Sequence, residues 1–523
     1  ITTIYSSNQS IKNTLYIIEI QMTTISENVD LLMQPESLVQ PESLVQPESS
    51  DDIMSSKDFA VNGASDQFVD MNSLQTKVAI AIAGSIDAGK SSFIGVMISN
   101  KLDDGNGSAR QLVAKHPHEI ESGKTSDIST RSVILPGTNS AITFVDLCGH
   151  EGYLKTTTYG VSGYFPDYAM LIVSANRGIL PMTKQHLKLL LTSSIPILTV
   201  VTHTDLVPDD VYEQTKKSIS QAYAFFCGKQ SRVAFVNDLT DQLKLADDPT
   251  LTETKKKAVE TIKDSMLNIP EGKQTIFPVI SVSNKTGFFI DVAREILEYL
   301  AVSRPFWNPG GKEAVENDKI VKMFRSGLEK KGIDPATILP EYKDFKGCMF
   351  YTDGVFNPPG IGLVVAGITR GNCIKPGDTM LMGPFGQNFH PVRVKSLHNN
   401  IKQIRPVHED HDRGCIAFAF TKKEEARRRD QIGKGIVLIS SLELVKNVCY
   451  RFKAIITLFT KSITLKSGYT PVLTMLTSRQ SARMIIDAKD NFGSDVICFD
   501  GTTSNIAIVT FKFKQHPEYV EPF

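Results

Sequence analysis

The sequence predicts an α/β domain followed by two all-β barrel domains, with a disordered tail in front of them. Three observations lead to this prediction. Apolar strand-like runs alternate with helical stretches from Thr76 to about Arg304, as in a parallel sheet covered by helices. Beyond Tyr342 the pattern changes to short alternating strands separated by glycine turns, which is typical of a closed barrel. Residues 1 to about 75 show neither pattern.

The boundaries follow the places where these patterns change. They divide the chain into a tail at 1–75, the α/β domain at 76–304, a connector at 305–342, and two barrels at 343–445 and 446–523. The tail repeats the unit QPESLV from Gln34 to Ser50, and each repeat carries a proline that breaks regular structure. Because it buries too little apolar surface to offset chain ordering, we expect disorder, with a docking motif for a partner as the alternative.

Composition excludes several classes of protein. The formal net charge is zero, so any contact with a nucleic acid must come from a local surface, and we expect no DNA partner. The seven cysteines are scattered and never spaced CxxC, which favours a reducing compartment and argues against a structural zinc site. No apolar run approaches the roughly 18 residues of a membrane span. We therefore expect a soluble, cytoplasmic protein without a membrane partner.

The stretch GSIDAGKS, Gly84 to Ser91, matches the phosphate-binding pattern GxxxxGK[ST] without a mismatch. It follows the apolar run Val78–Ala83, which predicts a buried strand, and it opens into SSFIGVMIS, which predicts a helix. Backbone N–H groups of such a loop can hold a di- or triphosphate. We expect Lys90 to reach the phosphates and Ser91 to ligate Mg²⁺. A chance strand-turn-helix is the alternative. The nucleotide-binding residues expected in this P-loop are Gly84, Ser85, Ile86, Asp87, Ala88, Gly89, Lys90 and Ser91.

A second motif, DLCG, follows the predicted strand ITFV about 55 residues past the P-loop. Ligands of parallel α/β sheets lie beyond the carboxyl ends of the strands, so both motifs should meet at one edge. Asp146 should supply a carboxylate for Mg²⁺, usually through water, and Gly149 a backbone N–H for the γ phosphate.

The chain contains, in order, GSIDAGKS, HEIESGKTS, DLCGHEGYLKTT, RGILPMTKQHL, THTD and SVSNKTG. This order resembles a translational GTPase of the elongation factor Tu and 1-alpha superfamily, and most of all its GTP-binding protein 1 and 2 branch. The resemblance extends from Lys77 to Phe523. It implies an α/β P-loop GTPase domain with two all-β barrels, GTP and GDP as ligands with Mg²⁺, hydrolysis of GTP, and an RNA, a tRNA or the ribosome as partner.

The resemblance also implies roles for individual residues. Thr125 should close on Mg²⁺ and the γ phosphate, and His150, directly after DLCG, should orient the attacking water. Asp87 lies where the family has an aspartate often linked to a monovalent cation, and Ile86 where it has an apolar gate residue. Phosphoryl transfer depends mainly on placement and charge neutralisation, so Lys90, a Mg²⁺ held by Ser91 and Thr125, and a water-orienting His150 would suffice for it. An ordinary loop histidine is the alternative for His150.

Base recognition should involve the tetrad Thr202-His203-Thr204-Asp205. Asp205 matches the family's carboxylate for N1 and N2 of guanine, and adenine offers no such donors, so guanine should be preferred. His203 replaces the lysine of the resembled pattern, and its imidazole can stack on the base. The residues Ser283, Asn284 and Lys285 match the loop that supports the base by backbone contacts.

Two departures keep other functions open. His203 and Lys124, which occupies the place of a gating isoleucine, both deviate from elongation factor Tu. A nucleotide-binding adaptor with weak hydrolysis and a regulator of mRNA turnover are therefore the alternatives to a translation-factor-like GTPase.

The remaining sequence supports this domain organisation. We expect a long helical segment between Val207 and Gln274 that includes TETKKKAVETIKDSM. Phe356 to Asp378 matches the pattern of the family's second domain, and Asn447 to Phe523 resembles its third, which the resemblance implies to be truncated before its last strand.

Overall fold

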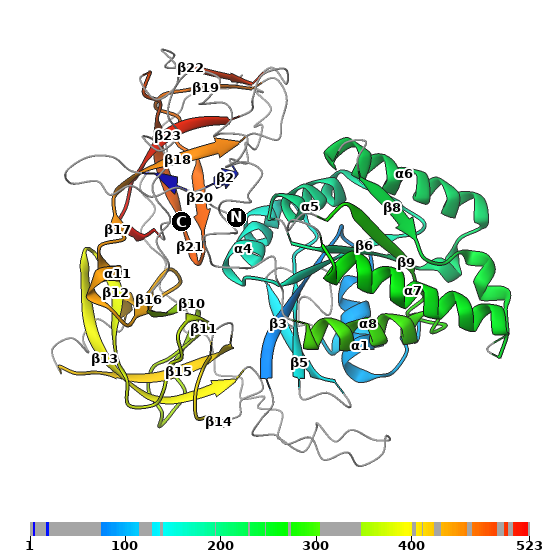
Figure 1. Ribbon diagram of the computed structural model, residues 1–523, viewed down its shortest axis with the longest axis horizontal. Coiled ribbons are helices and arrows are strands. Elements are labelled where there is room, and N and C mark those ends of the chain that lie inside the picture. The colour runs from blue at the N-terminus through cyan, green and yellow to red at the C-terminus, as the bar shows by residue number, and fades with distance from the viewer. Residues whose placement is uncertain are drawn as a thin grey trace, which may run out of the picture.

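A computed structural model of the chain describes three bodies of secondary structure (Figure 1). The described residues are 4–5, 17–19, 75–113, 128–135, 140–193, 195–227, 231–245, 247–269, 274–303, 347–399, 404–409, 412–422, 430–457, 463–488, 496–499 and 506–520. The predicted connector at 305–342 lies outside them. No helix in these ranges is both long and apolar enough to cross a membrane.

The first body contains a seven-stranded sheet in the order β4-β5-β3-β6-β7-β9-β8. Its strands are β3 (Gln75–Ala83), β4 (Ser129–Ile134), β5 (Ser140–Asp146), β6 (Tyr168–Ser174), β7 (Ile197–Thr202), β8 (Arg232–Phe235) and β9 (Ile276–Ser281). Neighbouring strands run parallel except for β4, which pairs antiparallel with β5 at one edge. The predicted parallel sheet is present, with one antiparallel edge strand added to it.

Helices cover both faces of this sheet, because alternate residues of its central strands are apolar on both sides. In β3, Val78, Ile80 and Ile82 pack in one core, whereas Ala79, Ala81 and Ala83 pack in the other. The first core includes α1 (Lys90–Ser99), α7 (Pro249–Leu267) and α8 (Ile290–Val302). The second includes α4 (Leu154–Gly163), α5 (Pro181–Thr192) and α6 (Asp209–Cys227). The α/β domain predicted from the sequence is therefore confirmed.

The long helical segment predicted between Val207 and Gln274, which includes TETKKKAVETIKDSM, is α7. Before it the chain also forms α6, the strand β8 and the short 3-10 helix η3 (Leu239–Leu243). β8 joins the sheet edge by parallel pairing with β9. Its four residues, RVAF, do not alternate between apolar and polar side chains, so the pairing with β9 identifies this strand and the sequence pattern does not.

The second body is a closed antiparallel barrel. Strands β12, β16, β10, β11, β15 and β13 pair in that order, and β13 pairs back to β12. The strands are β10 (Cys348–Phe356), β11 (Val364–Gly371), β12 (Thr379–Phe385), β13 (Asn388–Asn399), β15 (Arg413–Phe420) and β16 (Val437–Ile439), with β14 (Ile404–Arg405) attached to β13. Apolar side chains such as Phe350, Val365 and Leu438 fill its core. The predicted closed barrel is confirmed.

The third body is also built from β-strands, as the sequence predicts. β18 (Arg451–Thr457), β23 (Ile506–Phe513), β21 (Ser478–Ile485) and β20 (Val472–Met475) pair in series. Two further pairs join β17 (Val448–Cys449) to β24 (Glu518–Tyr519), and β19 (Ile463–Lys466) to β22 (Val496–Phe499). The pairings described here do not close into a ring, so a closed third domain stays a prediction.

Two strands from the predicted tail, β1 (Ile4–Tyr5) and β2 (Ile17–Glu19), pair with β18. The rest of residues 1–74 lies outside the described ranges, and the prediction of a disordered tail stays a prediction for them.

The α/β domain contacts both β domains close to helix α4 (Figure 1). The chain leaves α4 through Phe165, whose ring lies 5.3 Å from that of Tyr351 in the barrel. Arg413 of β15 donates a hydrogen bond from Nη2 to the carbonyl of Phe165. Leu476, which precedes β21 in the third domain, packs in the same cluster. The helix that follows the DLCG motif thus lies where the three domains meet.

Candidate nucleotide-binding site

The P-loop connects the buried strand β3 to helix α1, as its sequence predicts. Gly84 has a φ of 149°, and a Cβ atom there would lie 2.3 Å from the carbonyl oxygen of Ile172. Gly89 has a φ of 82° and caps α1 without a side-chain hydrogen bond. Only glycine suits the first position, because β6 approaches its backbone so closely. The first turn of α1 therefore has backbone N–H donors without a side-chain cap.

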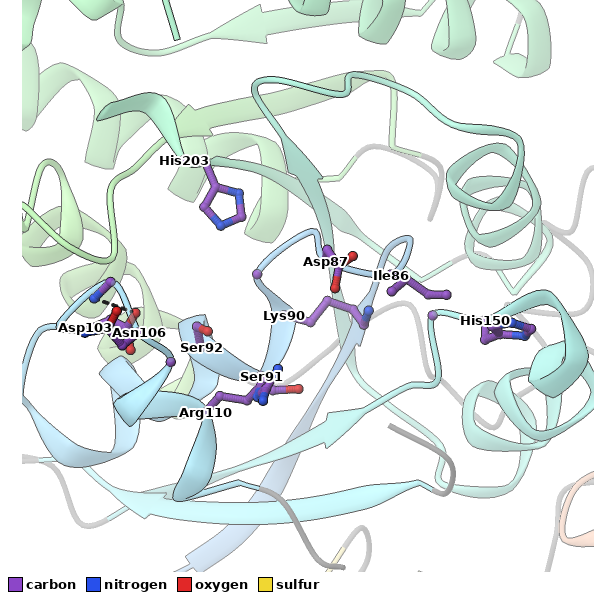
Figure 2. A pocket seen from close by; sticks show the side chains of 14 residues that line it. Ile86, Asp87, Lys90, Ser91, Ser92, Asp103, Asn106, Arg110, His150 and His203 are labelled. Atoms are coloured by element: carbon purple, nitrogen blue, oxygen red, sulfur yellow. Dashed lines mark hydrogen bonds between the residues drawn. The ribbon is translucent and has the colours of Figure 1, made fainter. Parts of the chain in front are cut away.

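A cavity of about 290 Å³ opens beside this loop (Figure 2). Its lining includes eight residues that the sequence singled out: Ile86, Asp87, Gly89, Lys90, Ser91, Gly149, His150 and His203. Six others line it that sequence reasoning missed: Ser92, Asp103, Gly105, Asn106, Gly107 and Arg110. Segments from four different parts of the chain thus meet at one edge of the sheet.

Lys90 and Ser91 connect the P-loop to the DLCG motif. The hydroxyl of Ser91 donates a 2.7 Å hydrogen bond to Oδ2 of Asp146, at the end of β5. Lys90 is buried, and its Nζ donates to the carbonyl of Ser85 at 2.8 Å. Burial lowers the pKa of Lys90, and the negative charge of Asp146 opposes that shift. A Cβ atom on Gly149 would lie 2.9 Å from the backbone nitrogen of Ile86 and from the carbonyl carbon of Ser85, so only glycine fits there without a shift of the P-loop backbone.

His150 directly follows this glycine and lies at the opposite end of the cavity from Asp103 and Asn106 (Figure 2). Its Nδ1 accepts a 3.0 Å hydrogen bond from the N–H of Gly152 and so caps the 3-10 helix η1 (Glu151–Tyr153). An acceptor nitrogen carries no proton, so the neutral ring has its proton on Nε2. The ring also packs edge-on against Tyr153, with centroids 5.8 Å apart.

His203 lines the cavity from the loop after β7, with a left-handed backbone φ of 58°. Its Nδ1 lies 2.8 Å from the hydroxyl of Ser174, which itself donates to Asn176. The hydroxyl of Thr202 donates to the Ala88 carbonyl at 2.7 Å, which ties this loop to the P-loop. Because the Ser174 proton is already engaged, Nδ1 of His203 is the donor and Nε2 the bare acceptor. Burial lowers the pKa of His203, against the opposing charge of Asp205, and favours this neutral form.

Asp205 and the SNK segment form one hydrogen-bonded unit outside the cavity lining. The hydroxyl of Ser283 donates to Oδ1 of Asp205 at 2.6 Å. The same hydroxyl oxygen accepts from the backbone N–H groups of Lys285, at 3.3 Å, and Thr286, at 3.0 Å. The carbonyl of Asn284 accepts a 2.9 Å hydrogen bond from the N–H of Asp103. The carboxylate predicted to read the base is therefore held in place by the loop predicted to support it.

The segment from Asp103 to Arg110 is the main part of the site that the sequence did not reveal. Asp103 accepts hydrogen bonds from the N–H groups of Gly105 and Ala109, at 3.2 and 2.9 Å. Both glycines of the GNG triplet have positive φ, 85° for Gly105 and 86° for Gly107. The text DDGNG is a turn signal that could have been noticed, but it matches no nucleotide-binding pattern.

Two predicted residues, Lys124 and Thr125, lie outside the described residues.

His186 contacts the P-loop, although the sequence did not single it out as a site residue. It is fully buried on α5, and its Nδ1 accepts a 2.9 Å hydrogen bond from the N–H of Gly84.

Comparisons with known proteins agree with this geometry. Residues 75–325 match the family described as the elongation factor Tu GTP-binding domain. The chain is 29% identical to GTP-binding protein 1 of Xenopus laevis over 469 residues, which cover 85% of this chain and 60% of the relative. It is 27% identical to GTP-binding protein 2 of Mus musculus, over 87% of this chain and 66% of the relative. The chain thus spans less than two thirds of the length of these relatives.

The fold has a counterpart among solved structures. A bacterial selenocysteine-specific elongation factor, EF-Sec, superposes with a TM-score of 0.51 at 16% identity, over 84% of this chain and 54% of that protein. Elongation factor 1-alpha of Methanopyrus kandleri is 27% identical over 48% of this chain and 64% of the relative. With the P-loop, Gly149 of the DLCG motif and His203 gathered around one cavity, the family match shows that residues 75–325 belong to the elongation factor Tu type of GTP-binding domain found in translational GTPases.

Proposed function

We propose that this protein binds GTP and GDP and hydrolyses GTP to GDP and phosphate, as a switch acting with RNA, a tRNA or the ribosome in the cytoplasm. The observation that carries the proposal is the contact of the Ser91 hydroxyl with the Asp146 carboxylate beside buried Lys90. These are the groups that phosphoryl transfer needs for placing and neutralising a phosphate chain.

The residues present suit a magnesium ion. Hydroxyl and carboxylate oxygens are hard ligands of the kind that Mg²⁺ prefers, and those of Ser91 and Asp146 are 2.7 Å apart. Thr125 is the proposed third protein ligand. Bound Mg²⁺ supplies positive charge to the phosphate oxygens.

Each remaining group has a proposed role. Lys90 binds phosphate oxygens, the P-loop and Gly149 donate backbone N–H groups to them, and Ile86 gates His150. The Nε2–H of His150 can donate to the attacking water while Nδ1 stays engaged with Gly152. Asp205, held by Ser283, selects guanine over adenine.

The partner is proposed from the relatives. Selenocysteine-specific elongation factors and elongation factor 1-alpha are both similar to parts of this chain, and the α4 region that follows His150 contacts both β domains. A partner docked on those domains could therefore act on the water-orienting loop. A nucleotide-binding adaptor or mRNA-turnover regulator with weak hydrolysis is the second candidate, because His203 stands where the family pattern has lysine.

Nucleotide binding and turnover with the full chain test this proposal. We expect GDP and GTP to displace a fluorescent guanine nucleotide, and ATP and XTP to do so only at far higher concentrations. Lys90→Ala should abolish measurable binding, since it removes the buried cation of the loop. Ribosomes should then raise GTP turnover by several orders of magnitude over the slow basal rate.

Each outcome has a clear meaning. ATP binding as tight as GTP binding would overturn guanine specificity. Binding without any stimulation, across a titration of ribosomes and of RNA, would support the adaptor. Retained micromolar affinity in Lys90→Ala would show that the P-loop is not the phosphate site.

A further inference from the structure

Arg110 brings a second positive charge to the cavity. Among the described residues of its lining, only Lys90 and Arg110 are cationic at neutral pH, whereas Asp87 and Asp103 are anionic. Figure 2 shows the Arg110 side chain reaching from its helix toward Ser91, at the start of α1. No P-loop pattern includes this residue, which lies about twenty positions further along the chain.

The backbone of Arg110 is held by close packing of α2 (Ser108–Gln111) on α1. A Cβ atom on Gly95 of α1 would lie 1.9 Å from the carbonyl oxygen of Ala109, so the two backbones touch where a side chain would not fit. The carboxylate of Asp103 receives the Ala109 N–H at 2.9 Å. Beyond α2, Arg131 of β4 donates to the carbonyl of Val113 at 2.9 Å. The backbone that carries Arg110 is therefore held at three places: by Asp103 at the start of α2, by the contact of α2 with Gly95, and by Arg131 after α2.

The charges that line the cavity favour a role for Arg110 in neutralising a bound phosphate chain. Lys90 already donates to the Ser85 carbonyl and lies near the negative charge of Asp146. A nucleoside di- or triphosphate brings several further negative charges into a cavity that Asp87 and Asp103 already make partly acidic. A guanidinium can donate two parallel hydrogen bonds to phosphate oxygens, and it keeps its charge when partly buried.

We propose that Arg110 binds the phosphate chain of the nucleotide directly, on the Ser91 side of the P-loop and alongside Lys90. This inference rests on the proposed function, since it concerns the same nucleotide. Its chemistry requires only a phosphorylated ligand, so it applies to GDP and GTP alike and not to guanosine.

Competition binding to the full chain separates a phosphate contact from a structural role. GDP, GTP and guanosine would each displace a fluorescent GDP from wild type, Arg110→Ala and Arg110→Lys. We expect Arg110→Ala to weaken GDP and GTP about tenfold or more, the usual effect of losing a charge-assisted hydrogen bond. Guanosine should change less than about twofold, because it has no phosphate to lose. Arg110→Lys should restore part of the affinity, as a point charge without the bidentate geometry.

Arg294→Ala is the matched control. Arg294 lies on α8, donates from Nη2 to the carbonyl of Val96 in α1 at 3.0 Å, and does not line the cavity. This variant loses an arginine contact with α1 but keeps the charge of the cavity lining unchanged, so it reports the effect of a purely structural loss on nucleotide affinity. We expect a lower melting temperature with the affinity ratio of GDP to guanosine unchanged.

Three results would overturn the inference. An equal loss for GDP and guanosine in Arg110→Ala would show that the residue only holds α2 in place. An unchanged affinity for GDP would show that the guanidinium does not reach the phosphates. Failure of the wild-type protein to bind any of the three ligands would overturn the proposed function as well, and so is distinguishable from the other two.

Discussion

The N–H of Gly84 donates a 2.9 Å hydrogen bond to Nδ1 of His186, which ties the first residue of the P-loop to α5, 102 positions away in sequence. The imidazole is fully buried, and its Nε2 has no hydrogen-bond partner among the described residues. Burial lowers the pKa of His186 to about 3, with a further contribution from the positive charge of Lys90. The ring therefore stays neutral and accepting while the loop is folded.

This relationship predicts a pH dependence of stability. The unfolded chain takes up a proton on His186 near its ordinary pKa of 6.5, whereas the folded protein does so only near 3. The free energy of unfolding should therefore fall as the pH drops below 6.5, because only the unfolded state binds that proton. His186→Asn, whose amide oxygen can replace Nδ1 as acceptor, should lose less stability between about pH 7 and pH 5 than the wild type.

Urea unfolding at a series of pH values measures this difference. Carboxylates elsewhere titrate equally in both proteins and cancel in the comparison. If the free energy of unfolding fell equally with pH in the wild type and in His186→Asn, the pKa of His186 would not be lowered in the folded protein, and the prediction would be wrong.

Asp205→Asn should change the base that the site prefers from guanine to xanthine. The carboxylate can accept from the guanine N1–H and 2-amino groups, whereas the amide can donate to the 2-oxo group of xanthine. Competition between GTP and XTP for the purified variant measures the change. The control is Ser283→Ala, which removes the 2.6 Å hydrogen bond that orients Asp205. It should weaken GTP without improving XTP, and an XTP gain there would contradict direct reading of the base by Asp205.

His150→Ala should remove most of the ribosome-stimulated turnover while leaving the GTP dissociation constant within a few fold. The imidazole acts on the water and hence mainly in the transition state, so ground-state binding changes little. Single-turnover hydrolysis with and without ribosomes provides the measurement. Tyr153→Phe keeps the ring that packs against His150 and should behave as wild type. Full stimulation of His150→Ala would exclude this histidine from the reaction.

Gly95→Ala should destabilise the α/β domain by about 1–3 kcal/mol, although alanine favours a helix more than glycine does. The added Cβ would lie 1.9 Å from the Ala109 carbonyl oxygen, and a backbone atom can yield only if α2 moves. Thermal unfolding measures the loss. Gly433→Ala is the control, since its Cβ would meet no atom within 4 Å and its φ is not positive. Equal melting temperatures for the two variants would show that α2 does not pack on α1 this closely.

The part of the site that follows local patterns could be predicted from the sequence. Gly84 to Ser91 is one contiguous loop whose geometry depends on its own glycines and on the strand and helix beside it. Asp146 could be placed near it, because parallel strands end at the same edge of a sheet. Arg110 and His186 could not be found in this way. Arg110 reaches the cavity because Gly95 lets α2 pack closely on α1. His186 contacts Gly84 because α5, which carries the histidine, packs beside the end of β3.

The sequence by itself determined the domain classes and the motifs, since the periods of apolar residues and the glycine turns are local properties of the chain. Tertiary structure alone decided which segments meet. It added β8 to the edge of the sheet, and it brought the loop from Asp103 to Gly107 to the cavity lining. The physical reason is that strand pairing and close helix contact depend on atoms far apart in sequence, and no window of neighbouring residues contains both partners of such a contact.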